Sequence, residues 1–115
     1  MAASAAFINN MLDDAFTGTF TMALFKTGLP STTGVEITGG GYTRETVSFS
    51  AATGKEKATS ADITFANLPT GNTIVAWGIY EGATLVDEKL LDVAFTPDVT
   101  NNELNVSYKF SLAGV

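Results

Sequence analysis

Two pairs of adjacent acidic residues come closest to a catalytic pattern in this chain: Asp13 with Asp14, and Asp87 with Glu88. Two carboxyl groups can hydrolyse a glycosidic bond when they converge across a cleft and one of them is desolvated. Side chains that are neighbours in sequence point apart, and charged side chains are mostly exposed. We therefore predict that both pairs lie on solvated faces and that the chain has no catalytic residue.

The chain contains neither histidine nor cysteine. Histidine is the side chain used most often for proton transfer near neutral pH, and protein zinc sites are built mainly from histidine and cysteine. Without cysteine there is no thiolate nucleophile, no redox centre and no disulfide. We expect a protein that is not an enzyme and that has no metal site and no cofactor.

A polar stretch and a triple glycine could each be mistaken for a ligand site. The run Asp98–Glu103 lacks the glycine and the terminal acid that a calcium loop requires, so it predicts a polar turn. The glycines at 39–41 are followed by Tyr42, Thr43 and Arg44, whereas a phosphate-binding loop continues with Gly-Lys-Ser/Thr into a helix. We expect these glycines to supply a backbone conformation, and we expect Arg44 to pair with a nearby acid such as Glu36 or Glu45.

The charge and the hydrophobic pattern exclude two classes of partner. Six basic residues against twelve acidic ones give a net charge of -6, which disfavours contact with the phosphates of nucleic acid. No apolar run reaches the ~18 residues that a membrane span needs. Polar residues interrupt the only candidate secretion signal near the N-terminus, so we expect synthesis in the cytoplasm.

One segment near the N-terminus has a helical period. Ser4 can cap it, and five large apolar residues form one stripe of the predicted helix: Phe7, Ile8, Met11, Leu12 and Phe16. Such a stripe must dock on the domain or on a partner, because a helix of about three turns is marginal alone. We therefore divide the chain into an amphipathic segment at 1–18 and a domain at 19–115.

The domain at 19–115 has a period of two, which is typical of strands. Turn signals separate about six to eight short strands, and no later segment is a helix long enough for a parallel crossover. The pattern predicts an all-β fold, an antiparallel β-sandwich with a short N-terminal helix. It leaves a jelly-roll and an Ig-like topology open. Trp77 falls between Val75 and Ile79 on an apolar face, so we expect its ring to be buried.

The run Gly39-Gly40-Gly41-Tyr42-Thr43-Arg44 resembles the Gly-Gly-Gly-Tyr-x-Arg signature of a family of small tailed-phage virion proteins, labelled head decoration or tail fibre. Further segments resemble the strands of that family in the same order: Thr21–Thr27, Val47–Phe49, Ala61–Phe65 and Trp77–Gly82. Where the family usually has a histidine, this chain has Trp77.

The resemblance implies a phage virion structural protein, made in the host cytoplasm, that acts as a capsid decoration or cement protein. Its expected partners are the phage major capsid protein, or a tail protein, and further copies of itself. A tail or tail-fibre component is the first alternative. A carbohydrate-binding module, with Tyr42, Trp77 or Tyr80 as a stacking platform, is the second.

The candidate partner-contact residues are those of the helical stripe and of the glycine motif: Phe7, Ile8, Met11, Leu12, Phe16, Tyr42 and Arg44. Tyrosine is enriched at interfaces, and the stripe offers a large apolar surface. Two roles stay open for the helix. It either contacts a partner or caps one end of its own domain.

Overall fold

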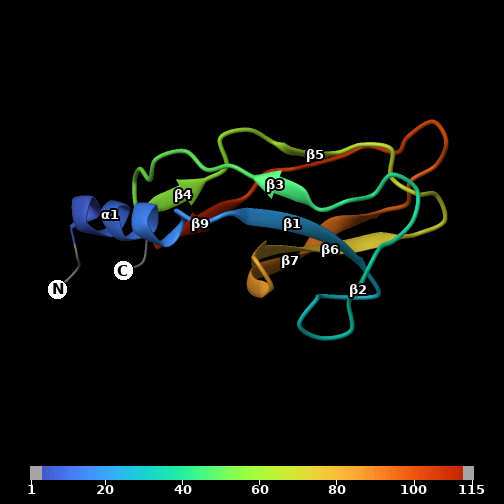
Figure 1. The fold of residues 1–115 in the computed structure, drawn as a ribbon, viewed down its shortest axis with the longest axis horizontal. Helices are drawn as coiled ribbons and strands as arrows, with labels where there is room; N and C mark the ends of the chain where they lie inside the picture. The colour runs from blue at the N-terminus through green and yellow to red at the C-terminus, as the bar shows by residue number, and fades with distance from the viewer. Residues whose placement is uncertain (1–3, 113–115) are drawn as a thin grey trace.

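In the computed structural model, which describes residues 4–112, one helix is followed by nine short or medium strands (Figure 1). The described elements are α1 (Ala5–Ala15), β1 (Phe20–Lys26), β2 (Val35–Glu36), β3 (Glu45–Val47), β4 (Glu56–Ala58), β5 (Ile63–Phe65), β6 (Ile74–Glu81), β7 (Thr84–Phe95), β8 (Leu104–Val106) and β9 (Lys109–Ser111). All strand pairs are antiparallel. The predicted all-β class with a short N-terminal helix is confirmed.

The strands form one larger sheet and two short ribbons. The larger sheet runs β2-β1-β6-β7, and β3 also pairs with β1; β4 pairs with β9, and β5 pairs with β8. The chain after β3 continues onto the segment that contains β4, because Ser50 N donates to Ala58 O at 3.0 Å and Ser60 N donates to Ser48 O at 3.0 Å. The strands are therefore connected in the order β7, β6, β1 and β3, and the segment after β3 pairs with the segment of β4. β7 is the edge strand of the larger sheet.

Strand β1 is covered on both faces. Met22 and Leu24 belong to the main apolar core, while Ala23 and Phe25 form a second cluster with Ala76 on the opposite face. The loop that follows β1 covers this second face. Its Pro30 lies so close to Gly78 that a Cβ on that residue would be 3.0 Å from Pro30 Cγ.

Strand β6 departs from the predicted alternation at its first residues. Trp77 and Ile79 are buried in the main core as expected, but Ile74 is in the same cluster, not on the opposite face. The reason is a register shift: Ile74 pairs with Phe95 and Ala76 pairs with Leu90, so four residues of β7 lie opposite Val75 alone. A bulge of this kind reverses the facing of the residues before it.

The alternating segment from Leu104 to Leu112 is divided into β8 and β9. The two halves pair with different strands, and the chain is irregular at Ser107 and Tyr108 between them. Thr59 holds this break from both sides, since its amide donates to Tyr108 O at 2.9 Å and its hydroxyl accepts from Tyr108 N at 3.3 Å. Val106 and Tyr108 are buried.

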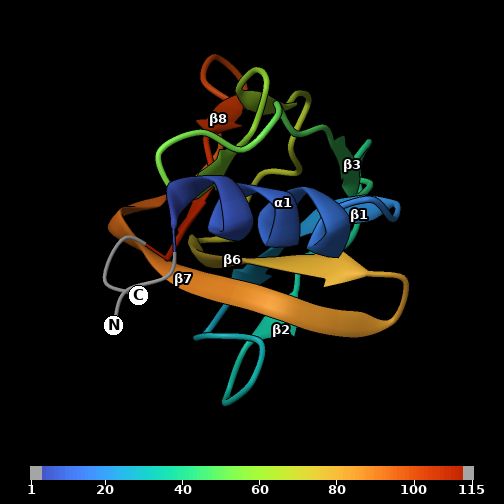
Figure 2. The same cartoon turned by 90° about the vertical axis from the view of Figure 1, so that its left-hand side faces the viewer.

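The helix α1 lies across one end of the strands, as Figure 2 shows from that end. Ser4 caps it by accepting a hydrogen bond from Phe7 N at 3.2 Å. Ile8 and Leu12 pack against Ala52. The ring of Phe16 joins the helix to the strands, with its centroid 4.8 to 5.6 Å from three other rings: Phe20, Phe49 and Phe110. This side of α1 thus caps its own domain.

Polar contacts hold α1 in the same position. Asp13 Oδ1 accepts hydrogen bonds from Ala52 N at 2.8 Å and from the ammonium of Lys57 at 2.7 Å, and Asn9 Oδ1 accepts from Lys55 N at 2.9 Å. Asp13 still keeps 42% of its side-chain surface exposed, as predicted, but its bonds to the strands were not predicted. The buried ammonium of Lys57 requires a counter-ion, and the helix supplies it.

The triple glycine forms the turn that leads from β2 towards β3. Gly39 and Gly40 have φ angles of 98° and 57°, and Tyr42 N donates to Gly39 O at 3.2 Å. A Cβ on Gly40 would lie 3.2 Å from Pro69 Cβ. Both the left-handed backbone and the close neighbour favour glycine, so the predicted conformational role is confirmed.

Candidate functional site

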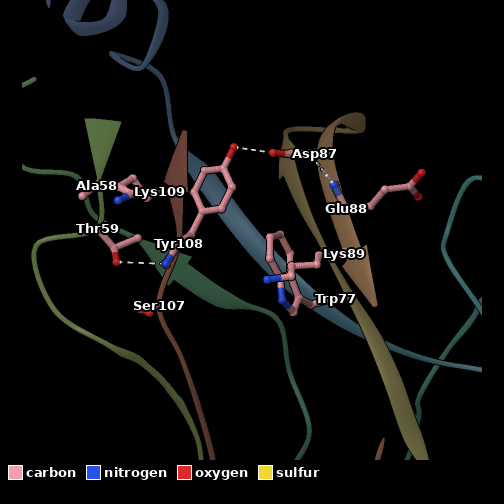
Figure 3. A pocket seen from close by; sticks show the side chains of 9 residues that line it. All are labelled: Ala58, Thr59, Trp77, Asp87, Glu88, Lys89, Ser107, Tyr108 and Lys109. Atoms are coloured by element: carbon pink, nitrogen blue, oxygen red, sulfur yellow. Dashed lines mark hydrogen bonds between the residues drawn. The ribbon is translucent and has the colours of Figure 1, made fainter. Parts of the chain in front are cut away.

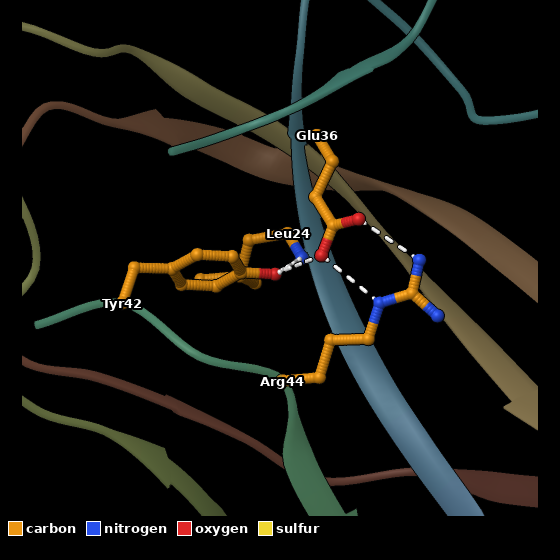
Figure 4. Close-up of polar contacts among 4 residues, drawn as sticks. All are labelled: Leu24, Glu36, Tyr42 and Arg44. Atoms are coloured by element: carbon orange, nitrogen blue, oxygen red, sulfur yellow. Dashed lines mark hydrogen bonds and ion pairs between the residues drawn. The ribbon is translucent and has the colours of Figure 1, made fainter. Parts of the chain in front are cut away.

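The glycine turn brings Tyr42 and Arg44 onto the carboxylate of Glu36 (Figure 4). Arg44 binds Glu36 with two hydrogen bonds, Nη2 to Oε1 at 2.8 Å and Nε to Oε2 at 3.0 Å. The Tyr42 hydroxyl donates to Glu36 Oε2 at 2.7 Å and accepts from Leu24 N at 3.0 Å. The predicted pairing of Arg44 with Glu36 is confirmed, and the motif ties β2 and the glycine turn to β1.

The electrostatics of this cluster hold each group in its ordinary ionisation state. The hydrogen bond from Arg44, assisted by the Tyr42 hydroxyl, lowers the pKa of Glu36. Burial, together with the neighbouring Glu36 carboxylate, raises the pKa of the Tyr42 phenol. The pKa of Arg44 is raised by the same carboxylate. The cluster is an ion pair with a permanent hydroxyl donor, and none of its groups is poised to exchange a proton near neutral pH.

These contacts bear on the expected roles of Tyr42 and Arg44 at a partner surface. Both functional groups already have partners within the chain, and the guanidinium of Arg44 also lies 4.3 Å from the ring centroid of Tyr80. The side chain of Arg44 keeps 36% of its surface exposed. A partner that binds here meets a preorganised patch, and contact with Tyr42 and Arg44 stays a prediction.

A pocket of about 680 Å³ opens between β7 and the break that separates β8 from β9 (Figure 3). Its floor contains the rings of Trp77 and Tyr108, which meet edge to face with centroids 5.5 Å apart. Asp87 closes one side, where its Oδ2 accepts from the Tyr108 hydroxyl at 2.7 Å and its Oδ1 from Glu88 N at 2.8 Å. The Asp87–Tyr108 bond is thus a link between the larger sheet and the last ribbon.

The two acids of this pocket do not form a catalytic pair. Figure 3 shows Asp87 pointing towards Tyr108 and Glu88 pointing to the other side of β7, where it accepts hydrogen bonds from the amide and hydroxyl of Ser31. The prediction that these neighbours point apart is confirmed. Burial, followed by the hydrogen bond to Asp87, raises the pKa of Tyr108, so the phenol stays a donor.

The aromatic rings proposed as a carbohydrate platform are largely covered. Trp77 is 5% exposed, as its position in β6 predicts, and its ring packs on Tyr108. Arg44 covers the ring of Tyr80, and Tyr42 stacks on Phe65 with centroids 6.3 Å apart. A sugar needs the open face of a ring, so these positions do not favour a carbohydrate-binding module.

The helical stripe is divided between the domain and the surface. Ile8 and Leu12 are almost fully buried and Phe16 is partly buried, so these three contact the chain itself. Phe7 and Met11 keep 60% and 47% of their surface exposed. Met11 also borders an apolar groove of about 280 Å³ between α1, β9 and the start of β7. Of the predicted contact residues in α1, Phe7 and Met11 are the ones that a partner can reach in this conformation.

The remaining polar run forms the expected turn. Asp98 Oδ1 accepts from the amides of Thr100 and Asn101 and from the Thr100 hydroxyl, and these bonds lower the pKa of Asp98. Among residues 4–112 no three acidic side chains gather where they could hold a metal ion. No helix in the same range is long and apolar enough to cross a membrane.

Comparison with known proteins finds no matching family model, no matching curated protein and no matching solved structure.

Two pairs of residues that shape the candidate surfaces were not predicted from the sequence: Asp13 with Lys57, and Asp87 with Tyr108. Each pair joins segments far apart in the chain, and an isolated charge or a tyrosine in a strand carries no local sign of such a partner.

Proposed function

We propose that this chain is a structural protein of a tailed-phage virion, a decoration protein that binds the outside of the head. The observation that carries the proposal is the order of the segments that resemble the virion family. They fall on β1, the glycine turn, β3, β5 and β6 of one fold. We further propose that the strands close as an antiparallel β-sandwich, of jelly-roll or Ig-like topology.

The proposed role depends on shape and surface, not on reactive groups. The Asp87–Glu88 pair is divergent, and Glu36 and Tyr42 are held in fixed ionisation states, which suits a binding protein better than an enzyme. Exposed apolar side chains on β7 and α1 supply surface for the major capsid protein. A protein that binds the assembled shell but not its free subunits stabilises the shell by mass action.

The test is binding of the purified chain to heads and to tails of the phage that encodes it, measured separately by co-sedimentation. The decoration role predicts saturable binding to heads, in a simple ratio to the major capsid protein. Binding to tails alone would support the tail or tail-fibre alternative and contradict decoration. Binding to neither would contradict both.

A matched pair of substitutions makes the test specific to a surface. Val93 in β7 and Val99 in the following loop are 81% and 86% exposed, so Val93→Lys and Val99→Lys add the same charge at similar exposure. If β7 contacts the shell, Val93→Lys weakens binding and Val99→Lys does not. Equal effects would place the contact elsewhere.

A further inference from the structure

Strand β7 presents a free edge. It spans 12 residues, and among the described strands it is bonded to β6 alone. Val86, Leu90 and Val93 are 37%, 52% and 81% exposed along it. A long edge strand with exposed apolar side chains is a template on which another strand can pair, through main-chain hydrogen bonds and alternate side-chain contacts.

The regular part of β7 limits where such pairing can occur. From Asp87 to Leu90 the strand stays in register with Ile79 to Ala76, whereas register shifts interrupt the ladder on either side. Bulges of this kind twist an edge and end strand pairing. A partner strand therefore has its best contact on Asp87–Leu90, and the pocket beside Asp87, Glu88 and Lys89 lies open along the same stretch.

We propose that the partner at this edge is a second copy of the chain, paired antiparallel through β7 about a two-fold axis at Glu88. Opposite residues of an antiparallel pair lie on the same face, so the axis must pass through a residue. With the axis at Glu88, Asp87 of each copy faces Lys89 of the other. The contact is self-complementary and closed.

The charges of β7 favour this register over its neighbours. An axis at Lys89 sets the two copies of Lys89 against each other, and an axis at Leu90 sets Glu88 against Asp92. With the axis at Glu88 the two copies of that residue meet, but each carboxylate is already turned to the loop after β1, where Ser31 donates to both of its oxygens. Opposite charges across a strand pair stabilise it, and like charges destabilise it.

The cation of Lys89 is the group on which this contact depends. The chain has a net charge of -6, so two copies repel each other at long range. Lys89 neutralises Asp87 of the second copy at the contact itself. At about 0.15 M salt the long-range repulsion is screened while the close pairs persist. The inference concerns the isolated protein and holds whether or not the chain binds a phage particle.

The experiment is sedimentation equilibrium of the full chain from micromolar to millimolar concentrations, at near-physiological salt. The proposal predicts a monomer–dimer equilibrium that Lys89→Glu weakens by at least about tenfold, because two attractive pairs become repulsive. Lys109→Glu is the matched control. Lys109 lines the same pocket but lies on β9, where it pairs with Glu56 at 3.3 Å, so its substitution leaves the dimer unchanged.

A mixture of two variants tests the register directly. Lys89→Glu and Asp87→Lys each fail to self-associate, but together they restore opposite charges and form a heterodimer. Thermal melts establish that both variants are folded, since Asp87→Lys loses the bond to Tyr108. If that variant does not fold, the comparison of Lys89→Glu with Lys109→Glu decides alone.

Three results would overturn the proposal. One is a wild-type chain that stays monomeric at every concentration. Another is a dimer that Lys89→Glu leaves as stable as the wild type. The third is a dimer that Met11→Lys dissociates while Lys89→Glu does not, which would assign the contact to the exposed face of α1. Each of these is measured without any particle, so failure here is distinct from failure of the proposed function.

Discussion

Strands β1 and β7 are both rich in apolar residues, but they lie at opposite extremes of burial. β1 pairs with β2 and β3 on one edge and with β6 on the other, and its Met22, Ala23 and Leu24 are fully buried. β7 pairs with β6 alone, and its Leu90 and Val93 are exposed. The contrast shows that position in the sheet, not apolar content, decides which strand belongs to the core and which is free to bind.

Truncating Trp77, in the strand between β1 and β7, should have the greatest effect on the free energy of unfolding. Trp77 lies in β6 between β1 and β7, is 5% exposed and packs on Tyr108. We expect Trp77→Ala to lower the free energy of unfolding by about 3–5 kcal/mol, because it opens a large cavity. Denaturant unfolding followed by circular dichroism measures this. Wild-type tryptophan emission at the wavelength of fully hydrated indole would contradict the buried position.

Truncating a buried leucine of β1 should lower the free energy of unfolding slightly less. Leu24 is fully buried in the main core, so Leu24→Ala should lower the free energy of unfolding by about 2–5 kcal/mol. The same denaturant titration applies. A loss within about 0.5 kcal/mol, the range of surface substitutions, would mean that the face of β1 that carries Leu24 is not enclosed.

The ion pair at the end of β1 gives a smaller effect that depends on pH. The side chains of Glu36 and Arg44 are 29% and 36% exposed, so we expect Arg44→Ala to cost about 1 kcal/mol near neutral pH. Arg44 lowers the pKa of Glu36 in the folded state. Its stabilisation is therefore complete above the ordinary value of 4.5 and is lost as the pH falls through the lowered pKa.

Unfolding titrations of the wild type and of Arg44→Ala, from neutral pH to below pH 4.5, measure this difference. The difference in the free energy of unfolding between the two proteins should become smaller in acid. It should not vanish, because the contact of Arg44 with the Tyr80 ring does not depend on Glu36. Lys109→Ala is the control, since Lys109 pairs with Glu56 in a more exposed position. A difference for Arg44→Ala that does not change with pH would refute the role of Glu36.

The sequence predicted those features that depend on local pattern. The period of two located the buried strands, and Ser4 marked the start of α1. The short spacing of Glu36 and Arg44 likewise made their ion pair predictable.

Features that depend on distant partners were not predictable in the same way. The bulge opposite Val75 arises because β7 has more residues than β6 can pair, which is a property of two strands together. Asp13 is bound to Lys57 across 44 positions of the chain, and Asp87 to Tyr108 across 21. A single sequence gives the periodicity of each segment but not the contacts between segments.

The smallest change in the free energy of unfolding should come from truncating a leucine of the exposed strand β7. Leu90 in β7 is 52% exposed, against 0% for Leu24 in β1, so the same truncation removes little buried surface. We expect Leu90→Ala to change the free energy of unfolding by no more than about 0.5 kcal/mol at protein concentrations where the chain is monomeric. Denaturant titrations at low and high protein concentration separate the contribution of Leu90 to the monomer from its contribution to the proposed dimer. At high concentration Leu90→Ala should lose more stability than at low concentration, because Leu90 ends the regular stretch of β7 that the proposed dimer covers. A loss of about 2 kcal/mol or more at low concentration would instead mean that Leu90 is buried within the monomer and that β7 has no free face.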